Sequence, residues 1–117
     1  MSRNLPDVHK QFLPDYDEWT PPEQLLALLG DKTLRTRDKV ELVVGVYAME
    51  HRGNHPSEQK IADILSLSKS RAHEVMLELL ALGRAERRHG KFALRFGVYS
   101  NPLVSQFLAA LGYNTEI

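Results

Sequence analysis

Residues 55–83 read HPSEQKIADILSLSKSRAHEVMLELLALG, a stretch in which two runs of apolar residues at helical spacing nearly meet. Pro56-Ser57 opens the first run, and Ser68 is a suitable N-cap for a second helix over about 69–82. Only Ser66-Leu67-Ser68 separates the two runs. Such a short connection predicts two helices that cross sharply instead of lying antiparallel.

Helical spacing divides both runs into an inward and an outward face. In the first run, the residues expected to point inward are Ile61, Ile64 and Leu65. In the second run, they are Ala72, Val75, Met76, Leu79 and Leu82. The residues expected to face solvent there are Ser70, His73, Glu74 and Leu77, flanked by Lys69 and Arg71. We expect Leu77 to pack on another part of the chain. The first turn of the second helix is therefore polar and basic.

Two further helices are predicted before this pair. Thr20 and Glu23 have the spacing of a capping box and Pro21 suits a first helical position, so a helix is expected over about 21–29. The stretch TRDKVELVVGVYAMEHRG (36–53) has a helical period, with one apolar face made of Val40, Val43, Val44, Tyr47 and His51.

After Gly83 the apolar period changes from 3.6 to 2. The stretch AERRHGKFALRF (85–96) predicts two strands joined at His89-Gly90, with Phe92, Leu94 and Phe96 alternating toward a core. A last helix is expected over 102–111, where Asn101 is the cap, Pro102 the first residue and Gly112 the end.

The order of these elements predicts a mainly α fold with a small β-hairpin wing. It is the order of a winged helix-turn-helix with extra N- and C-terminal helices. We expect an extended arm over 1–18 and a single domain over 19–117, with the winged helix-turn-helix core at 36–96.

Composition is that of an ordinary globular chain, with 117 residues, 43% apolar and 26% charged. No window approaches the ~18 apolar residues of a membrane span, and the first residues lack the apolar core of a signal peptide. The chain has no cysteine, so it has neither disulfides nor thiolate metal ligands. We expect a cytoplasmic protein without a membrane partner.

Formal net charge is zero, but the charge is unevenly distributed. Residues 1–59 hold seven Lys/Arg against ten Asp/Glu, whereas residues 60–95 hold eight against four, a balance of +4. A basic segment beside an acidic one can bind phosphates locally while the whole chain stays neutral. The alternative is that this imbalance is only ordinary variation in surface charge.

The stretch IADILSLSKSRAHEVMLELLALGRAER (61–87) resembles the MarR-type pattern of Ile/Leu-Ala, Leu-Ser-x-Ser, a later Leu, then Gly and a basic strand. Residues 36–96 are also similar to the amino-terminal domain of the LexA repressor, on the basis of Gly53, Pro56-Ser57 and Ile61-Ala62. Two features depart from that domain. Lys60 stands where an acid is usual, and nothing after residue 97 resembles the self-cleaving protease domain.

The resemblance implies binding to double-stranded DNA, with the helix at 69–82 in the major groove. The implied contacts there are Ser57, Ser68, Lys69, Ser70, Arg71, His73 and Glu74. Arg71 suits a bidentate guanine contact, worth about 1–3 kcal/mol of discrimination. Glu74 either accepts a hydrogen bond from cytosine or pairs with a Lys/Arg at helical spacing.

The hairpin at 84–96 is expected to contact DNA backbone or minor groove. Arg87, Arg88 and Lys91 are its predicted phosphate ligands, and Arg84, His89 and Arg95 add to its positive charge. The alternative is a solvated hairpin whose charges prevent pairing of its edges with other chains.

Enzymatic chemistry is not indicated. The sequence contains no GxxxxGK[ST], GxSxG or HExxH, and His51 and His55 lack a third metal ligand, so we expect no catalytic residues, metal or cofactor. Two functional classes remain. The first is a sequence-specific DNA-binding protein, either a transcriptional regulator or a replication or partition protein. The second is a winged-helix protein-interaction module.

The terminal segments carry more apolar residues than one narrow stripe requires. Such a surplus commonly marks an interface. MarR-like proteins form two-fold dimers through terminal helices, so the resemblance favours a homodimer. The predicted dimerisation residues are Leu103, Phe107, Leu108 and Leu111. A monomer in which the terminal helices cover each other is the alternative.

Overall fold

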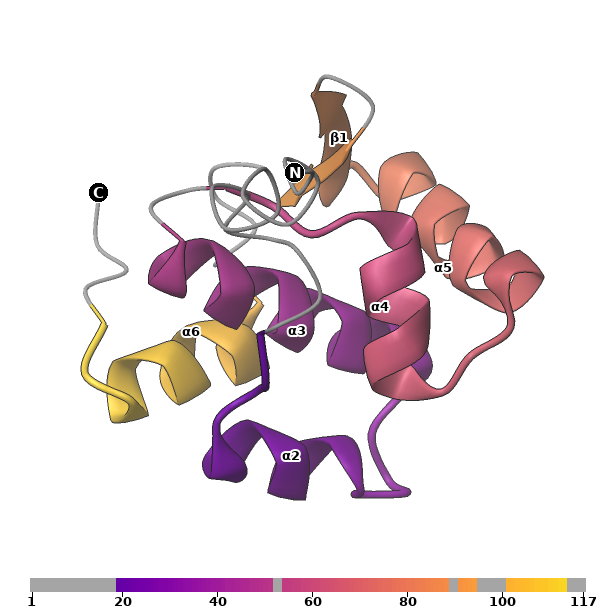
Figure 1. The fold of residues 1–117 in the computed structure, drawn as a ribbon. Coiled ribbons are helices and arrows are strands. Elements are labelled where there is room, and N and C mark those ends of the chain that lie inside the picture. The colour runs from indigo at the N-terminus through magenta and orange to yellow at the C-terminus, as the bar shows by residue number, and fades with distance from the viewer. Residues whose placement is uncertain (1–18, 52–53, 89–90, 95–100, 114–117) are drawn as a thin grey trace, which may run out of the picture.

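The computed structural model describes residues 19–51, 54–88, 91–94 and 101–113. Its elements in chain order are α2 (Glu23–Leu29), α3 (Thr36–Glu50), α4 (Glu58–Leu65), α5 (Lys69–Ala81), β1 (Ala85–Arg88), β2 (Lys91–Leu94) and α6 (Pro102–Ala110). The chain is mainly helical, as predicted (Figure 1). The expected arm over 1–18 lies outside the described residues.

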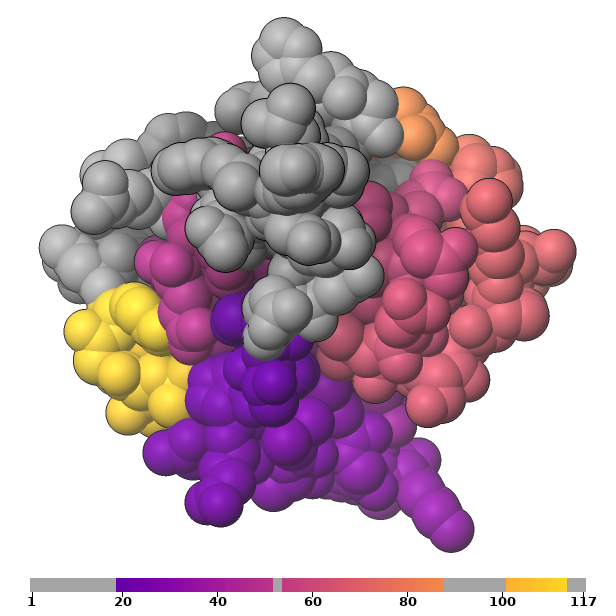
Figure 2. Space-filling model, in the orientation of Figure 1, coloured from indigo at the N-terminus to yellow at the C-terminus, as the bar shows by residue number. Residues whose placement is uncertain are grey.

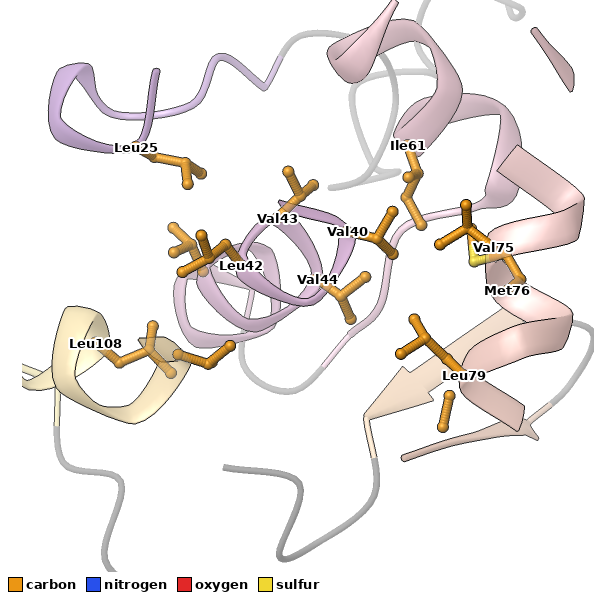
Figure 3. Close-up of a cluster of buried hydrophobic side chains, with 13 residues drawn as sticks. Leu25, Val40, Leu42, Val43, Val44, Ile61, Val75, Met76, Leu79 and Leu108 are labelled. Carbon is orange, nitrogen blue, oxygen red and sulfur yellow. The ribbon is translucent and has the colours of Figure 1, made fainter. Parts of the chain in front are cut away.

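Helix α3 is the centre of the structure. It contacts α2, α4, α5, α6 and β2, and every residue from Val40 to Ala48 is buried. Figure 3 shows Leu42 pointing toward Leu25 and Leu108, while Val40 and Val44 point toward α4 and α5. The predicted apolar face of Val40, Val43, Val44 and Tyr47 is buried, and burial extends beyond this face to the other residues of 40–48. Four helices surround α3, so its residues are buried all round its circumference.

Helix α2 begins later than the sequence suggested. Its N-cap is Pro22, with φ −59° and ψ 154°, and no side chain caps it, so the predicted capping box of Thr20 and Glu23 is absent. The reason is Pro21-Pro22. A residue that precedes proline is driven out of the α region, so Pro21 cannot be the first helical residue.

Two serines cap the central helix pair, as predicted. The Ser57 Oγ accepts a hydrogen bond from the Lys60 N–H at 3.1 Å, and the Ser68 Oγ accepts one from the Arg71 N–H at 3.0 Å. Each bond satisfies one of the N–H groups that a helix start leaves without a partner.

The turn between α4 and α5 is a Schellman motif. Ser66 has φ 55° and ψ 42°, the Leu67 N–H donates to the Ala62 carbonyl at 2.9 Å, and the Ser66 N–H donates to the Asp63 carbonyl at 3.3 Å. This motif stops α4 abruptly and redirects the chain. The two helices can therefore cross after a connection of three residues.

The same motif ends α5 and α6, where glycine takes the left-handed position. Gly83 has φ 73° and Gly112 has φ 95°. Leu82 is consequently the C-cap of α5 and is 49% exposed, so its predicted inward position is wrong. The other four predicted inward residues of α5 are buried, namely Ala72, Val75, Met76 and Leu79.

Strands β1 and β2 pair antiparallel, with Ala85 opposite Leu94 and Arg88 opposite Lys91. β1 contacts α5 and β2 contacts α3, so the strands lie beside the helix pair (Figure 1). The predicted turn at His89-Gly90 and the predicted core residue Phe96 lie outside the described residues, as do the side chains of Phe92 and Leu94.

Helix α6 packs on α3. The Asn101 Oδ1 accepts a hydrogen bond from the Leu103 N–H at 3.1 Å, and Pro102 is the first helical residue, as predicted. Val104 and Leu108 are its fully buried residues. No helix in the described part of the chain is both long enough and apolar enough to cross a bilayer.

Candidate nucleic-acid interface

The candidate interface is the outer face of α5. The side chains of Ala72, Val75, Met76 and Leu79 anchor the opposite face of this helix in the core. The predicted contact residues of the same helix are therefore exposed together: Lys69, Ser70, Arg71, His73 and Glu74. In Figure 2, the side chains of α4 and α5 form the right-hand part of the visible surface.

Lys69 and Ser70 begin this face. Within the described residues, neither side chain has an ion pair or side-chain hydrogen bond. Both lie directly after the cap Ser68, where the first N–H groups of α5 also point outward. The start of α5 thus combines an unneutralised ammonium group, a hydroxyl and backbone donors, a set of groups suited to phosphate oxygens.

Arg71 and Glu74 form an ion pair on the surface of α5. Arg71 Nη1 lies 3.3 Å from Glu74 Oε1, and both side chains are at least half exposed. Two roles are predicted for Glu74, and the one seen in the structure is the pairing with a cation at helical spacing. Exposed pairs of this kind contribute only about 0.3–0.5 kcal/mol, so Arg71 can exchange this partner for another at little cost.

Glu58 connects the helix pair to the hairpin. Its carboxylate lies 3.2 Å from His73 Nδ1 on α5 and 3.2 Å from Arg87 Nη2 on β1. This contact does not follow from any local pattern, because the three residues are separated by 14 or more positions in the chain. Ser57, a predicted DNA ligand, immediately precedes Glu58 and is half-buried.

The two capping serines remain able to bind an external acceptor. Ser57 and Ser68 each use the hydroxyl oxygen to accept a backbone hydrogen bond. A hydroxyl also carries one O–H donor, which is directed independently. The capping role is thus compatible with the predicted phosphate contacts of both residues.

Arg84 is held by a buried carboxylate, and its side chain is only 29% exposed. Its guanidinium donates through Nε and Nη2 to Glu41 Oε2 and Oε1, at 3.0 and 2.5 Å. Glu41 is fully buried in α3 and also accepts a hydrogen bond from Asn101 Nδ2 at 2.8 Å. The predicted contribution of Arg84 to a basic wing is wrong, because a buried carboxylate requires this cation as its partner.

The excess of positive charge over residues 60–95 therefore overstates the charge of the surface. Arg84 neutralises Glu41, and Lys60 is buried in α4. Arg87 remains exposed on β1 beside Glu58. The structure describes the backbone of Arg88 and Lys91 within the strands, and their side chains lie outside the described residues, as does Arg95.

Leu77 is an apolar residue on the polar face of α5. It is 48% exposed and does not contribute to the core cluster, so the expectation that it packs elsewhere on the chain is wrong. It lies three positions after Glu74 and four after His73, hence on the same side of the helix.

The predicted dimerisation residues are less available than expected. Leu108 is fully buried against the core and cannot lie in an interface. Leu103, Phe107 and Leu111 are half-buried and pack against the same core. Helix α6 lies directly on the central helix, so its apolar stripe is largely covered within the chain.

His51, a candidate metal ligand, packs against aromatic side chains. Its ring stacks on Tyr47 with the centroids 3.8 Å apart, and its Nδ1 lies 2.7 Å from the Tyr47 carbonyl oxygen. Trp19 contacts both rings edge-on. Among the described residues, no three His, Cys, Asp or Glu side chains come close enough together to hold a metal ion.

Two features of the site could not be found from local patterns, namely the Glu58 bridge and the Glu41 pair. Glu41 did give one signal, since it stands between Val40 and Leu42 in a strongly apolar run. A carboxylate in such a position needs a cation from elsewhere in the chain.

No family model matches the chain, and the comparisons with curated proteins and with solved structures found no match either.

Proposed function

We propose that this protein binds double-stranded DNA in a sequence-specific manner, as a winged helix-turn-helix protein with α5 in the major groove. The observation that carries the proposal is the exposed polar start of α5, set at a sharp turn from α4. Lys69, Ser70 and Arg71 lie there together, outside a helix face that is firmly packed in the core.

The dimensions of the elements support this mode of binding. A major groove about 12 Å wide accepts one α-helix with its side chains. Arg71 reaches guanine edges from the first turn of α5, while Ser57, Ser68 and Lys69 bind backbone phosphates. His73 and Glu74 extend the same face toward base edges. Contacts to phosphate fix the position of the protein, and contacts to bases select the sequence.

The hairpin supplies the second contact. Arg87, Arg88 and Lys91 belong to β1 and β2, beside the helix pair, and bind phosphates or the minor groove next to the site of α5. Transcriptional regulation is the role that best fits a small protein of this kind. A replication or partition protein that binds repeated sites uses the same geometry.

A protein-interaction module is the second candidate, and the exposure of Leu77 on α5 and of its C-cap Leu82 favours it. Contact with a protein partner would remove these apolar side chains from water, which is energetically favourable. Salt distinguishes the two functions, since counterion release makes DNA binding weaken with salt, whereas apolar contacts do not weaken in this way.

A homodimer remains part of the proposal, with a narrower basis than the sequence suggested. The residues available for it are Leu103, Phe107 and Leu111, together with the exposed Leu26 on α2. A two-fold dimer sets its recognition helices about one DNA turn, ~34 Å, apart and requires a roughly palindromic site.

The test is selection from a random duplex library at low salt, followed by affinity measurements in a salt series. We expect an enriched motif and a linear fall of log affinity with log salt, at about −0.9 per neutralised phosphate. Retention of no duplex at low salt contradicts the proposal. Binding without any enriched motif contradicts its sequence-specific part.

A further inference from the structure

Glu58 is the point at which the two cationic elements of the candidate interface meet. Its Oε1 and Oε2 lie 3.2 and 3.3 Å from His73 Nδ1, and Oε2 also lies 3.2 Å from Arg87 Nη2. The three residues come from α4, α5 and β1. Glu58 is the most covered of the three, because its side chain is 20% exposed against 47% for His73 and 40% for Arg87.

The carboxylate presents the same chemistry as a DNA phosphate. Both are anions with oxygens that accept hydrogen bonds from guanidinium and imidazole groups. A donor that is held by Glu58 in the free protein must leave this carboxylate before it can bind phosphate. Glu58 also repels any phosphate that approaches the space between α5 and β1.

We propose that Glu58 is an autoinhibitory acid, which occupies His73 and Arg87 in the free protein and thereby lowers its affinity for phosphate polyanions. This inference rests on the proposed function, because it concerns the same surface. It assigns that surface a built-in competitor, because His73 and Arg87 must leave the Glu58 carboxylate before they can bind a polyanion.

The test compares Glu58→Gln with Glu23→Gln. Glu23 is the matched control, because it is also the first residue of a helix, is exposed, and has no ion pair within the described part of the chain. Figure 1 shows α2 at the opposite end of the molecule from the hairpin. Both variants change net charge equally and remove an acid from a helix start, so they differ in the contact with His73 and Arg87 and in distance from the candidate interface.

Two polyanions are used as probes, a duplex of random sequence and heparin. For Glu58→Gln we expect roughly three- to tenfold tighter binding of the duplex than for Glu23→Gln, the range set by one ion pair with Arg87 and one contact with His73. Elution from heparin should also require more salt. Addition of Arg87→Gln to Glu58→Gln should remove most of the gain.

Equal behaviour of Glu58→Gln and Glu23→Gln on both probes overturns the inference. Weaker binding by Glu58→Gln also overturns it, because Glu58 would then hold His73 and Arg87 in a favourable position. If wild type binds heparin but no duplex, the proposed function fails while the heparin comparison still decides the role of Glu58.

A second variant protects the test against loss of folding. Glu58→Asp keeps a negative charge at the helix start and withdraws the carboxylate by one methylene from both partners. We expect an affinity between those of wild type and Glu58→Gln. Circular dichroism establishes that each variant retains its helices, and a Glu58→Asp affinity equal to that of wild type on both probes also counts against the inference.

Discussion

Arg84 forms a two-point ion pair with Glu41, a residue 43 positions earlier in the chain. Glu41 Oε1 also accepts a hydrogen bond from Asn101, the cap of α6. A single buried carboxylate therefore joins the central helix, the start of the hairpin and the start of the last helix. Such a group stabilises the fold only while all its partners are present.

Replacement of Arg84 by alanine should destabilise the protein by about 3 kcal/mol, because it leaves the buried carboxylate without its cation. The measurement is the free energy of unfolding from urea denaturation. In the double variant Glu41→Leu and Arg84→Met we expect much of the loss to be recovered. A cost below about 1 kcal/mol for Arg84→Ala would place the pair among ordinary surface contacts.

Substitution of Ser66 by glycine should stabilise the protein by about 0.5 kcal/mol. Ser66 has a left-handed backbone, which costs an L-residue roughly 1–2 kcal/mol, and glycine's greater freedom in the unfolded chain offsets part of the gain. The matched control is Gly83→Ala, which places a Cβ in open space at a positive φ and should destabilise by about 1 kcal/mol. Thermal unfolding of both variants measures these changes in stability. A loss of stability for Ser66→Gly contradicts the prediction.

Two cations of the proposed interface should have different roles. Arg71→Ala is expected to relax base preference, because it removes the side chain proposed to bind guanine edges. In the free protein that side chain has only a weak surface pair with Glu74, which it can leave at little cost. Lys91→Ala should weaken binding to all sequences alike and make the salt dependence shallower by about 0.9. Arg88→Ala is expected to resemble Lys91→Ala. Motif selection and salt titration measure both effects, and the reverse assignment would mean that the hairpin reads the bases.

The two apolar residues Phe107 and Leu108 separate dimerisation from folding. Leu108→Ala should cost about 2–5 kcal/mol in stability whatever the oligomeric state, because Leu108 is buried in the core. Phe107→Glu should give folded monomers with weaker DNA binding and an unchanged half-site preference. Sedimentation equilibrium at micromolar concentration is the measurement, and a monomeric wild type removes both the dimer and the palindromic site.

Local patterns predicted much of the helical structure and missed what depends on distant residues. Ser57, Ser68 and Asn101 are caps as expected, because each acts on its own helix within three residues. The start of α2 differs from the prediction because Pro22 restricts the backbone of Pro21, although Pro21 alone suits a first helical position. The burial of α3 on all sides has a signal in its own sequence, since residues 42–48 are all apolar or glycine, but the four helices that cover it cannot be identified from that run.

The candidate site likewise contains features that follow from local patterns and features that depend on distant residues. The outward face of α5 follows from its helical period, and the exposure of Lys69, Arg71 and His73 agrees with that prediction. The partner of each charge does not follow from the period. Local patterns group Arg84 with the surface cations, because its partner Glu41 is 43 positions away. They also favour an interface at Leu108, because an apolar stripe alone does not reveal which chain covers it.

The complete burial of α3 also determines how the molecule opens. Amide hydrogens of residues 40–48 lie in a helix that is covered by segments from both ends of the described chain, so no single segment can detach and expose all of them. In deuterated water these amides should exchange only through global unfolding, and their protection should equal the full free energy of unfolding. Amides at the exposed C-terminal end of α5 should exchange far earlier, through local fraying.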